Sequence, residues 1–431
     1  MKKICLSVVG MFLMLIHAHS QYVKDSTTFK SRKLKLEEIN IVSSYYDQSA
    51  DKSAVMGGRT DSKGIGNVTD LANGIDLKFI SHDRFQRKNN LGFGLGIDHH
   101  TAASQAYVDS SGKAKNDGTR IYPTIDWSIE NEKKGTEFGL GAYYSAERHY
   151  YHSLGLHVEF SKKTTTNGLF GIKLTGYFDN IKMIKPSEFS SADSVETGTT
   201  GNYVVYVTTA SGHQTAVEYN ANGQVVSSSG SGIPSKSRDT YTGEFSFAQI
   251  LNPRMQVSVV TDVVYQKGYL GLPFHRVYFN NGKDTIENLP QQRFKLPIGL
   301  RFNYFLGDNI IMRTYYRFYW DNWGVLSHTA SLETVIKITP FFSLSPFYRF
   351  YAQTAAKYFA PYATHTTDEQ YYSSNYALAA FTSHSFGMGL RVAPPKGILF
   401  QGFSALELRY NRYLQSTNLQ ANNISVNMKF K

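Results

Sequence analysis

Alternation between apolar and polar residues is the feature of this sequence that most restricts its fold. In 294–304 the even positions are apolar and the odd positions are polar residues, glycine or proline, and the same period of two recurs in 91–100, 310–320 and 424–430. Successive side chains of a β-strand point to opposite faces, so each segment predicts a strand with one apolar and one polar face. These segments begin near Ile39 and continue to the last residue, which predicts an all-β chain.

Composition supports this fold class and excludes others. Aromatic residues make up 14% of the 431 residues, and long runs of strong helix formers are rare. The formal charge is +11, but the basic residues are dispersed rather than clustered, so we predict no nucleic-acid binding. After the N-terminus no apolar run approaches the roughly 18 residues of a transmembrane helix, whereas a strand of a membrane barrel needs only about ten alternating residues.

The N-terminus predicts export. Two lysines precede an apolar run over 4–16, and Ala18-His19-Ser20 fits a small-residue cleavage site. This run is shorter than the roughly 20 residues that cross a bilayer as a helix, so we expect a cleaved signal peptide over 1–20. The only cysteine, Cys5, lies within it, so the mature chain has no thiol for disulfides, metal binding or catalysis.

Apolar and polar residues alternate in the strands of both a soluble sandwich and a membrane barrel, so alternation does not distinguish these folds. The lengths of the connections do. About sixteen strands (fourteen to eighteen) follow from the pattern, and their connections alternate between short and long. The long connections fall near 49–68, 101–119, 181–238, 268–292 and 357–383, and three further connections expected to be long, around Glu147, Asn322 and Ser416, are short. One rim of short turns and one rim of long loops is typical of an outer-membrane barrel, with its short turns in the periplasm.

We therefore predict a single up-and-down antiparallel transmembrane β-barrel over 36–431, in the outer membrane of a Gram-negative bacterium and in contact with its lipids. Residues 21–35 would form a short periplasmic segment, too small for a plug domain. An even strand count would place both termini at the periplasmic rim.

Three motifs also resemble a known family. These are SSYYDQSADKSAVMGG over 43–58, GIDHHTAAS over 96–104 and GTRIYP over 118–123. They are similar to a family of Gram-negative outer-membrane proteins that is catalogued only as a domain of unknown function, and the resemblance extends from about residue 37 to the C-terminus. The resemblance implies a barrel but no activity, cofactor or catalytic residue.

Charged residues of the polar face should line the lumen, because Arg or Lys facing lipid at the midplane costs about 2–4 kcal/mol. Strand parity places eleven acids and eleven bases inside, the acids mainly in the first half of the chain and the bases mainly in the second. Consecutive strands are neighbours in such a barrel, so an acidic wall would face a basic wall. The predicted acidic wall comprises Asp76, Asp98, Asp126, Glu130, Glu137, Glu159, Asp179, Glu244 and Asp262. The predicted basic wall comprises Lys295, Arg301, Arg313, Arg317, Lys337, Arg349, Arg391 and Arg409. Lys78, Lys173, Glu333, Glu407 and Lys429 are the remaining inward charges.

This arrangement favours a passive or substrate-specific channel for small polar solutes. One alternative stays open, in which the inward charges pair with their neighbours or with an infolded loop and hold the barrel closed. The protein would then be a structural or assembly protein that presents loop 181–238 to a periplasmic or surface partner. Within that loop, 203–208 and 215–226 predict hairpin strands, with a type I′ turn at Asn222-Gly223.

Catalysis and metal binding are less favoured. An outer-membrane enzyme is a third alternative, but no Gly-x-Ser-x-Gly pattern lies between a strand and a helix, so we predict no enzymatic activity and no cofactor. Metal binding needs three or four converging ligands, whereas adjacent strand residues point to opposite faces. We therefore assign a group of five histidines to the rim or the aromatic belt rather than to a metal site. They are His99, His100, His149, His152 and His157.

Overall fold

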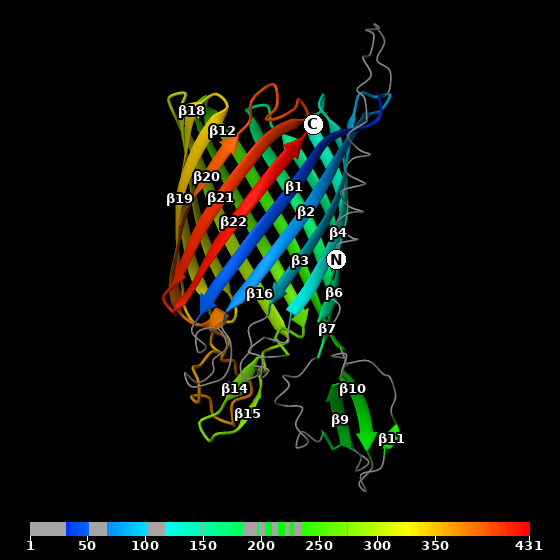
Figure 1. The fold of residues 1–431 in the computed structure, drawn as a ribbon, viewed down its shortest axis with the longest axis vertical. Helices are drawn as coiled ribbons and strands as arrows, with labels where there is room; N and C mark the ends of the chain where they lie inside the picture. The colour runs from blue at the N-terminus through cyan, green and yellow to red at the C-terminus, as the bar shows by residue number, and fades with distance from the viewer. Residues whose placement is uncertain are drawn as a thin grey trace.

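Sixteen antiparallel strands close into a barrel in the part of the chain that the computed structural model describes (Figure 1). The described residues are 32–50, 67–101, 117–147, 150–183, 196–197, 203–208, 214–219, 225–227, 235–273 and 275–431. The first half of the barrel consists of β1 (Arg32–Ala50), β2 (Val68–His82), β3 (Lys88–Thr101), β4 (Asp117–Asn131), β5 (Thr136–Glu147), β6 (Tyr151–Lys163), β7 (Gly168–Lys182) and β12 (Ser235–Asn252). The second half consists of β13 (Met255–Gly268), β16 (Gln292–Leu306), β17 (Ile310–Asp321), β18 (Leu326–Thr339), β19 (Phe342–Gln353), β20 (Phe381–Val392), β21 (Phe403–Gln415) and β22 (Leu419–Phe430).

Closure occurs between the first and last strands. β1 and β22 pair antiparallel from Ile39 opposite Phe430 to Ala50 opposite Leu419, and they lie side by side in Figure 1 in dark blue and red. The predicted closed, up-and-down barrel is therefore confirmed. Strand β1 begins at Arg32, inside the segment 21–35 that we expected to precede the barrel.

The apolar positions of the strands face outward. On three successive strands Leu140, Leu156 and Leu174 remain 45%, 48% and 52% exposed, and large apolar residues are equally exposed on the other barrel strands. The polar residues that alternate with them face the lumen. An apolar outer surface around a closed sheet is the arrangement that a lipid bilayer requires.

The two rims differ as predicted. The rim where β1 begins and β22 ends, here the terminal rim, carries turns of two to five residues, apart from the ten residues 393–402. The opposite rim, here the loop rim, carries the five long connections and the three short ones around 148–150, 322–325 and 416–418. Loop 181–238 is shortened at both ends by the strands it joins, and it contains a four-stranded sheet of its own. This sheet comprises β8 (Glu196–Thr197), β9 (Tyr203–Thr208), β10 (Gln214–Tyr219) and β11 (Val225–Ser227), in the order β11-β10-β9-β8. The expected turn at Asn222-Gly223 lies outside the described residues.

Close approach of β20 and β21 gives a test of the fold. A Cβ atom added at Gly387 would overlap the carbonyl oxygen of Tyr410, whereas at Gly389 the nearest atoms, on Arg409 and Ser345, would lie 3.5 Å away. Gly387→Ala should therefore destabilise the barrel by about 1–3 kcal/mol, and Gly389→Ala should not. The measurement is the temperature at which the detergent-extracted protein loses its folded gel mobility. Equal temperatures for the two variants would contradict this packing.

Candidate functional site

The predicted acidic wall lies on β2 to β7, β12 and β13, and much of it is paired locally. Asp98 contacts Arg120 on the next strand, and Asp179 Oδ2 lies 2.7 Å from Arg238 Nε. Three further contacts join Glu130 to Lys163 at 2.8 Å, Glu159 to Lys173 at 3.8 Å and Asp126 to His157 at 3.6 Å. Arg120, Lys163 and Arg238 are lumen charges that are absent from the predicted walls. They lie near strand ends, where extending the same strand parity by a few residues would have found them.

The predicted basic wall lies on β16 to β21 and is paired less. Arg409 contacts Glu333 at 2.9 Å and Glu407 at 3.2 Å, and Arg313 contacts Glu333 at 3.4 Å. The other members have no ion-pair partner among the described residues; they are Lys295, Arg301, Arg317, Lys337, Arg349 and Arg391. Two of these guanidinium groups lie against tyrosine rings of β17 instead, Arg301 at 5.5 Å from the centre of Tyr315 and Arg317 at 6.0 Å from that of Tyr319.

Several inward charges in the terminal-rim half of the barrel are in contact with solvent. The side chains of Arg313, Asp126 and Glu159 are 51%, 47% and 40% exposed. Side chains in a barrel with a filled interior would be covered by their neighbours. The described part of the lumen therefore contains solvent-accessible space.

Two adjoining hollows, of about 320 and 250 Å³, lie in the acidic wall. Asp76, Gly94 and Thr124 line both of them, and Asp126 and Glu159 line the larger. Glycines at alternate positions of β3 leave this space, because they present no side chain to the lumen.

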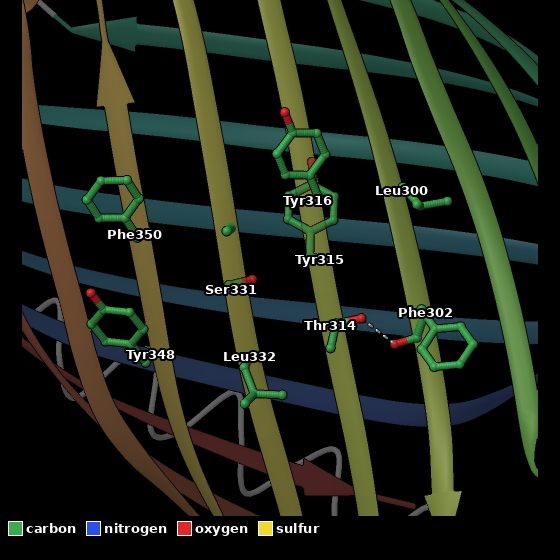
Figure 2. Close-up of a pocket in the computed structure, with 10 residues that line it drawn as sticks. Leu300, Phe302, Thr314, Tyr315, Tyr316, Ser331, Leu332, Tyr348 and Phe350 are labelled. Carbon is green, nitrogen blue, oxygen red and sulfur yellow. Dashed lines mark hydrogen bonds between the residues drawn. The ribbon is translucent and has the colours of Figure 1, made fainter.

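A third hollow, of about 350 Å³, lies on the outer face and is unrelated to the lumen. It forms where the small Thr314 and Ala330 stand between larger apolar and aromatic side chains of β16 to β19 (Figure 2). The Thr314 hydroxyl donates to the carbonyl oxygen of Phe302, 3.1 Å away, so its polar group is satisfied within the sheet. Because outward-facing apolar and aromatic side chains line this hollow, it is suited to acyl chains rather than to polar solutes.

Two loops and one turn form a folded cap at the loop rim. The cap comprises residues 269–273, 275–291, 322–325 and 354–380, and it contains the hairpin β14 (Arg276–Tyr278) and β15 (Asp284–Ile286) seen at the lower rim of Figure 1. Backbone bridges join Phe279 to His365 and Asn288 to Tyr372, so the two loops hold each other. Their buried core consists of Leu289, Trp323, Val325, Ala356 and Leu378.

Asp321 fixes this cap to the basic wall. Its carboxylate is 1% exposed and accepts hydrogen bonds from Arg293 Nε at 3.0 Å, Tyr319 Oη at 2.7 Å and the backbone N–H groups of Trp323 and Val325 at 3.0 Å. Arg293 also lies 4.3 Å from the centre of the Trp323 ring. Because Arg293 and Tyr319 have the parity of the lumen, the cap core packs on the inner side of the rim.

A buried glutamate joins the two loops of the cap. Glu287 is 4% exposed, and its carboxyl group accepts from the Leu272 N–H at 2.5 Å and from the Ser373 hydroxyl at 2.6 Å. Burial raises the pKa of Glu287 to about 7, and the two hydrogen bonds oppose that rise. The neighbouring Tyr269 has its pKa raised by burial and by the Glu287 charge, and burial lowers the pKa of His275 to about 4.

Protonation of Glu287 should therefore stabilise the cap. Its ordinary pKa of 4.5 lies below its pKa of about 7 in the folded cap. The contribution of Glu287 to cap stability should be fully present at a pH below its ordinary pKa. It should be lost as the pH rises between the two pKa values, because Glu287 then ionises in the open cap but stays protonated in the folded cap. Above the folded pKa the stability should stay low. Glu287→Gln should stabilise the cap by up to about 3 kcal/mol near pH 8 and change little near pH 4. Hydrogen exchange of the cap amides measures this.

Glu369 provides the matched control. Hydrogen bonds from the Thr366 N–H and from His365 lower the pKa of Glu369, although partial burial opposes them. Glu369→Gln should therefore weaken the cap at neutral pH and have little effect in acid. If both substitutions destabilised the cap equally near neutral pH, the assignment of a protonated Glu287 would be wrong.

Three of the five histidines have separate partners. His100 Nε2 lies 3.3 Å from Glu147, His157 Nε2 lies 3.6 Å from Asp126, and His99 Nδ1 lies 3.0 Å from the Thr119 hydroxyl. His149 is outside the described residues. Within the described ranges no group of three or more histidine or acidic side chains is placed to hold a metal ion, and no helix is long and apolar enough to cross a membrane.

The chain belongs to a family described as a protein of unknown function, DUF3570, whose model matches residues 96–427. This confirms the family resemblance, although the motif over 43–58 lies outside the match. No functionally curated protein matches the chain.

Among solved structures, OccAB3 of Acinetobacter baumannii is 10% identical with a TM-score of 0.36, over 93% of this chain and 99% of that one. The deltaS2 mutant of the monoaromatic hydrocarbon channel TodX is 9% identical with a TM-score of 0.38, over 92% and 89%. A bacterial polysaccharide outer membrane secretin is 8% identical with a TM-score of 0.42, over 91% and 98%. Similarity this low carries no argument about function.

Proposed function

We propose that this protein is an outer-membrane channel through which small polar solutes diffuse. The observation that carries the proposal is the exposure of Arg313, Asp126 and Glu159 inside a closed barrel. Barrels of about sixteen strands are wide enough to leave an aqueous passage. In this proposal the signal peptide over 1–20 is removed, the terminal rim faces the periplasm, and the loop rim faces the outside.

The two predicted walls would set the charge preference of the channel. Arginine or lysine partners neutralise four of the nine members of the acidic wall, whereas six of the eight members of the basic wall have no ion-pair partner in the described chain. A surplus of uncompensated positive charge along one side attracts anions into a narrow passage. We therefore expect the channel to prefer anionic over cationic solutes of equal size.

The alternative is a closed barrel that presents loop 181–238 to a partner protein. The observation that favours it is the separate sheet β8–β11 within that loop, since a folded insert can form a binding surface. No catalytic role is proposed.

Planar-bilayer recordings of the purified protein distinguish the two functions. An open lumen should give stepwise conductance, because each inserted barrel adds one passage. Absence of any step at every voltage, together with co-purifying proteins that disappear when 186–236 is deleted, would replace the channel by the closed-barrel function.

The exposed acids of the hollow give a second test. Neutralising Asp126 and Glu159 with Asn and Gln should shift the reversal potential further toward anions in a salt gradient, chiefly at low ionic strength, because salt screens such charges within about 10 Å at 0.1 M. Glu130, which is paired with Lys163 at 2.8 Å near the terminal rim, gives the control Glu130→Gln. An equal shift in the control would show that position in the lumen is irrelevant.

A further inference from the structure

Three arginines of the basic wall have a distinctive neighbourhood. Arg301, Arg317 and Arg349 lie on β16, β17 and β19, and none has an ion-pair partner within the described chain. Their partners in register are small or hydroxyl-bearing neutral residues. Arg301 stands between Ser258 and Tyr315, Arg317 between Gly299 and Thr329, and Arg349 between Ser331 and Ser385.

The register brings these arginines to one patch of the wall. Arg301, Tyr315, Ser331 and Arg349 form a continuous row across four strands, and Arg317 lies two residues along β17 from Tyr315. Strands lie about 4.8 Å apart, so the Cα atoms at the two ends of this row are separated by about 14 Å. Two extended guanidinium side chains can converge on the space above Tyr315 and Ser331, and Arg317 approaches the same space from the loop-rim side.

One donor in this patch has no acceptor. Arg317 Nε is buried and has no hydrogen-bond partner. Leaving a buried donor of a charged group unsatisfied costs free energy, so such an atom is normally paired with protein, water or a ligand. The carboxylate of Asp262, on the far side of β16, forms no ion pair with it in the described structure, and its Oδ1 is likewise unpaired.

The boundary of the patch is also defined. One row closer to the terminal rim, Glu333 binds both Arg313 at 3.4 Å and Arg409 at 2.9 Å. Those two arginines therefore already have an oxyanion partner within the protein. The three arginines nearer the loop rim have hydroxyl groups around them and no carboxylate in contact.

We propose that Arg301, Arg317 and Arg349 form a binding site for the oxyanion group of a small solute, a carboxylate or a phosphate. The planar guanidinium fork binds two oxygens at once, which a chloride ion cannot offer, and the hydroxyls of Thr329 and Ser331 are further donors. This site rests on the proposed channel function and specifies its substrate class. Solutes bearing an oxyanion would bind transiently at this point of the passage, on the terminal-rim side of the cap.

Calorimetric titration of the detergent-solubilised protein tests the site without requiring an open pore. Acetate and inorganic phosphate represent the two oxyanion sources, with chloride as the comparison at equal ionic strength. We expect saturable binding of at least one oxyanion. Replacing all three arginines with Gln should weaken it at least tenfold, and Arg317→Gln alone severalfold. Arg313→Gln, at the arginine held by Glu333, should change it less than twofold. Folded gel mobility verifies each variant, and the single variant carries the test if the triple one does not fold.

The outcomes separate the site from the channel. Binding of acetate alone, or of phosphate alone, supports the site and identifies the source. Absence of saturable binding, or equal weakening in Arg313→Gln, overturns it even if the bilayer recordings show open channels. Saturable binding that depends on the three arginines, in a protein without conductance, would retain the site and refute the channel.

Discussion

Pairing of β1 with β22 is the constraint on which the rest of the structure depends. In hydrocarbon an unpaired backbone N–H or C=O group costs several kcal/mol, so a sheet can cross a bilayer only if it has no edge. The register from Ile39 opposite Phe430 to Ala50 opposite Leu419 removes the two edges that a sixteen-stranded sheet would otherwise expose. Closure also fixes the parity of every strand, because one slipped residue would turn its apolar face to the lumen.

The same constraint explains where the sheet tolerates defects. Pro123, Pro297 and Pro346 lie inside strands, and the pairing of β4 with β5, of β13 with β16 and of β18 with β19 lacks two partners beside each of them. On its other side each proline stays in register, opposite Leu95, Tyr319 and Met388 respectively. A proline lacks only the donor toward one neighbour, so the second neighbour keeps the strand in place. The defects are therefore local, and the barrel remains closed around them.

The periodicity of the sequence predicts the strands of the barrel but not the contacts at its rims. A period of two is enough to assign Arg301 and Asp126 to the lumen, because the opposite face of each strand is apolar and exposed. Arg120 borders the predicted connection 101–119 and Arg238 lies within the predicted connection 181–238, so neither is among the predicted lumen charges. In the structure they pair with Asp98 and Asp179 on the neighbouring strands. Glu287 lies in a loop whose sequence has no apolar-polar alternation. Its burial depends on how this loop packs against the loop 354–380, which is distant in the sequence. No local pattern predicts that packing.

The cap and the basic wall form one physical unit because of Asp321. This carboxylate ends β17, accepts from the backbone of the turn that follows, and binds Arg293 and Tyr319 on the inner face. Asp321 therefore pairs with Arg293 near the loop rim, as Glu333 pairs with Arg313 and Arg409 nearer the terminal rim. Between these two carboxylates the wall keeps Arg301, Arg317 and Arg349 without an ion pair in the described chain. In the proposed channel, acids at these two levels thus leave three neighbouring guanidinium groups uncompensated between them, and a passing anionic solute is attracted there.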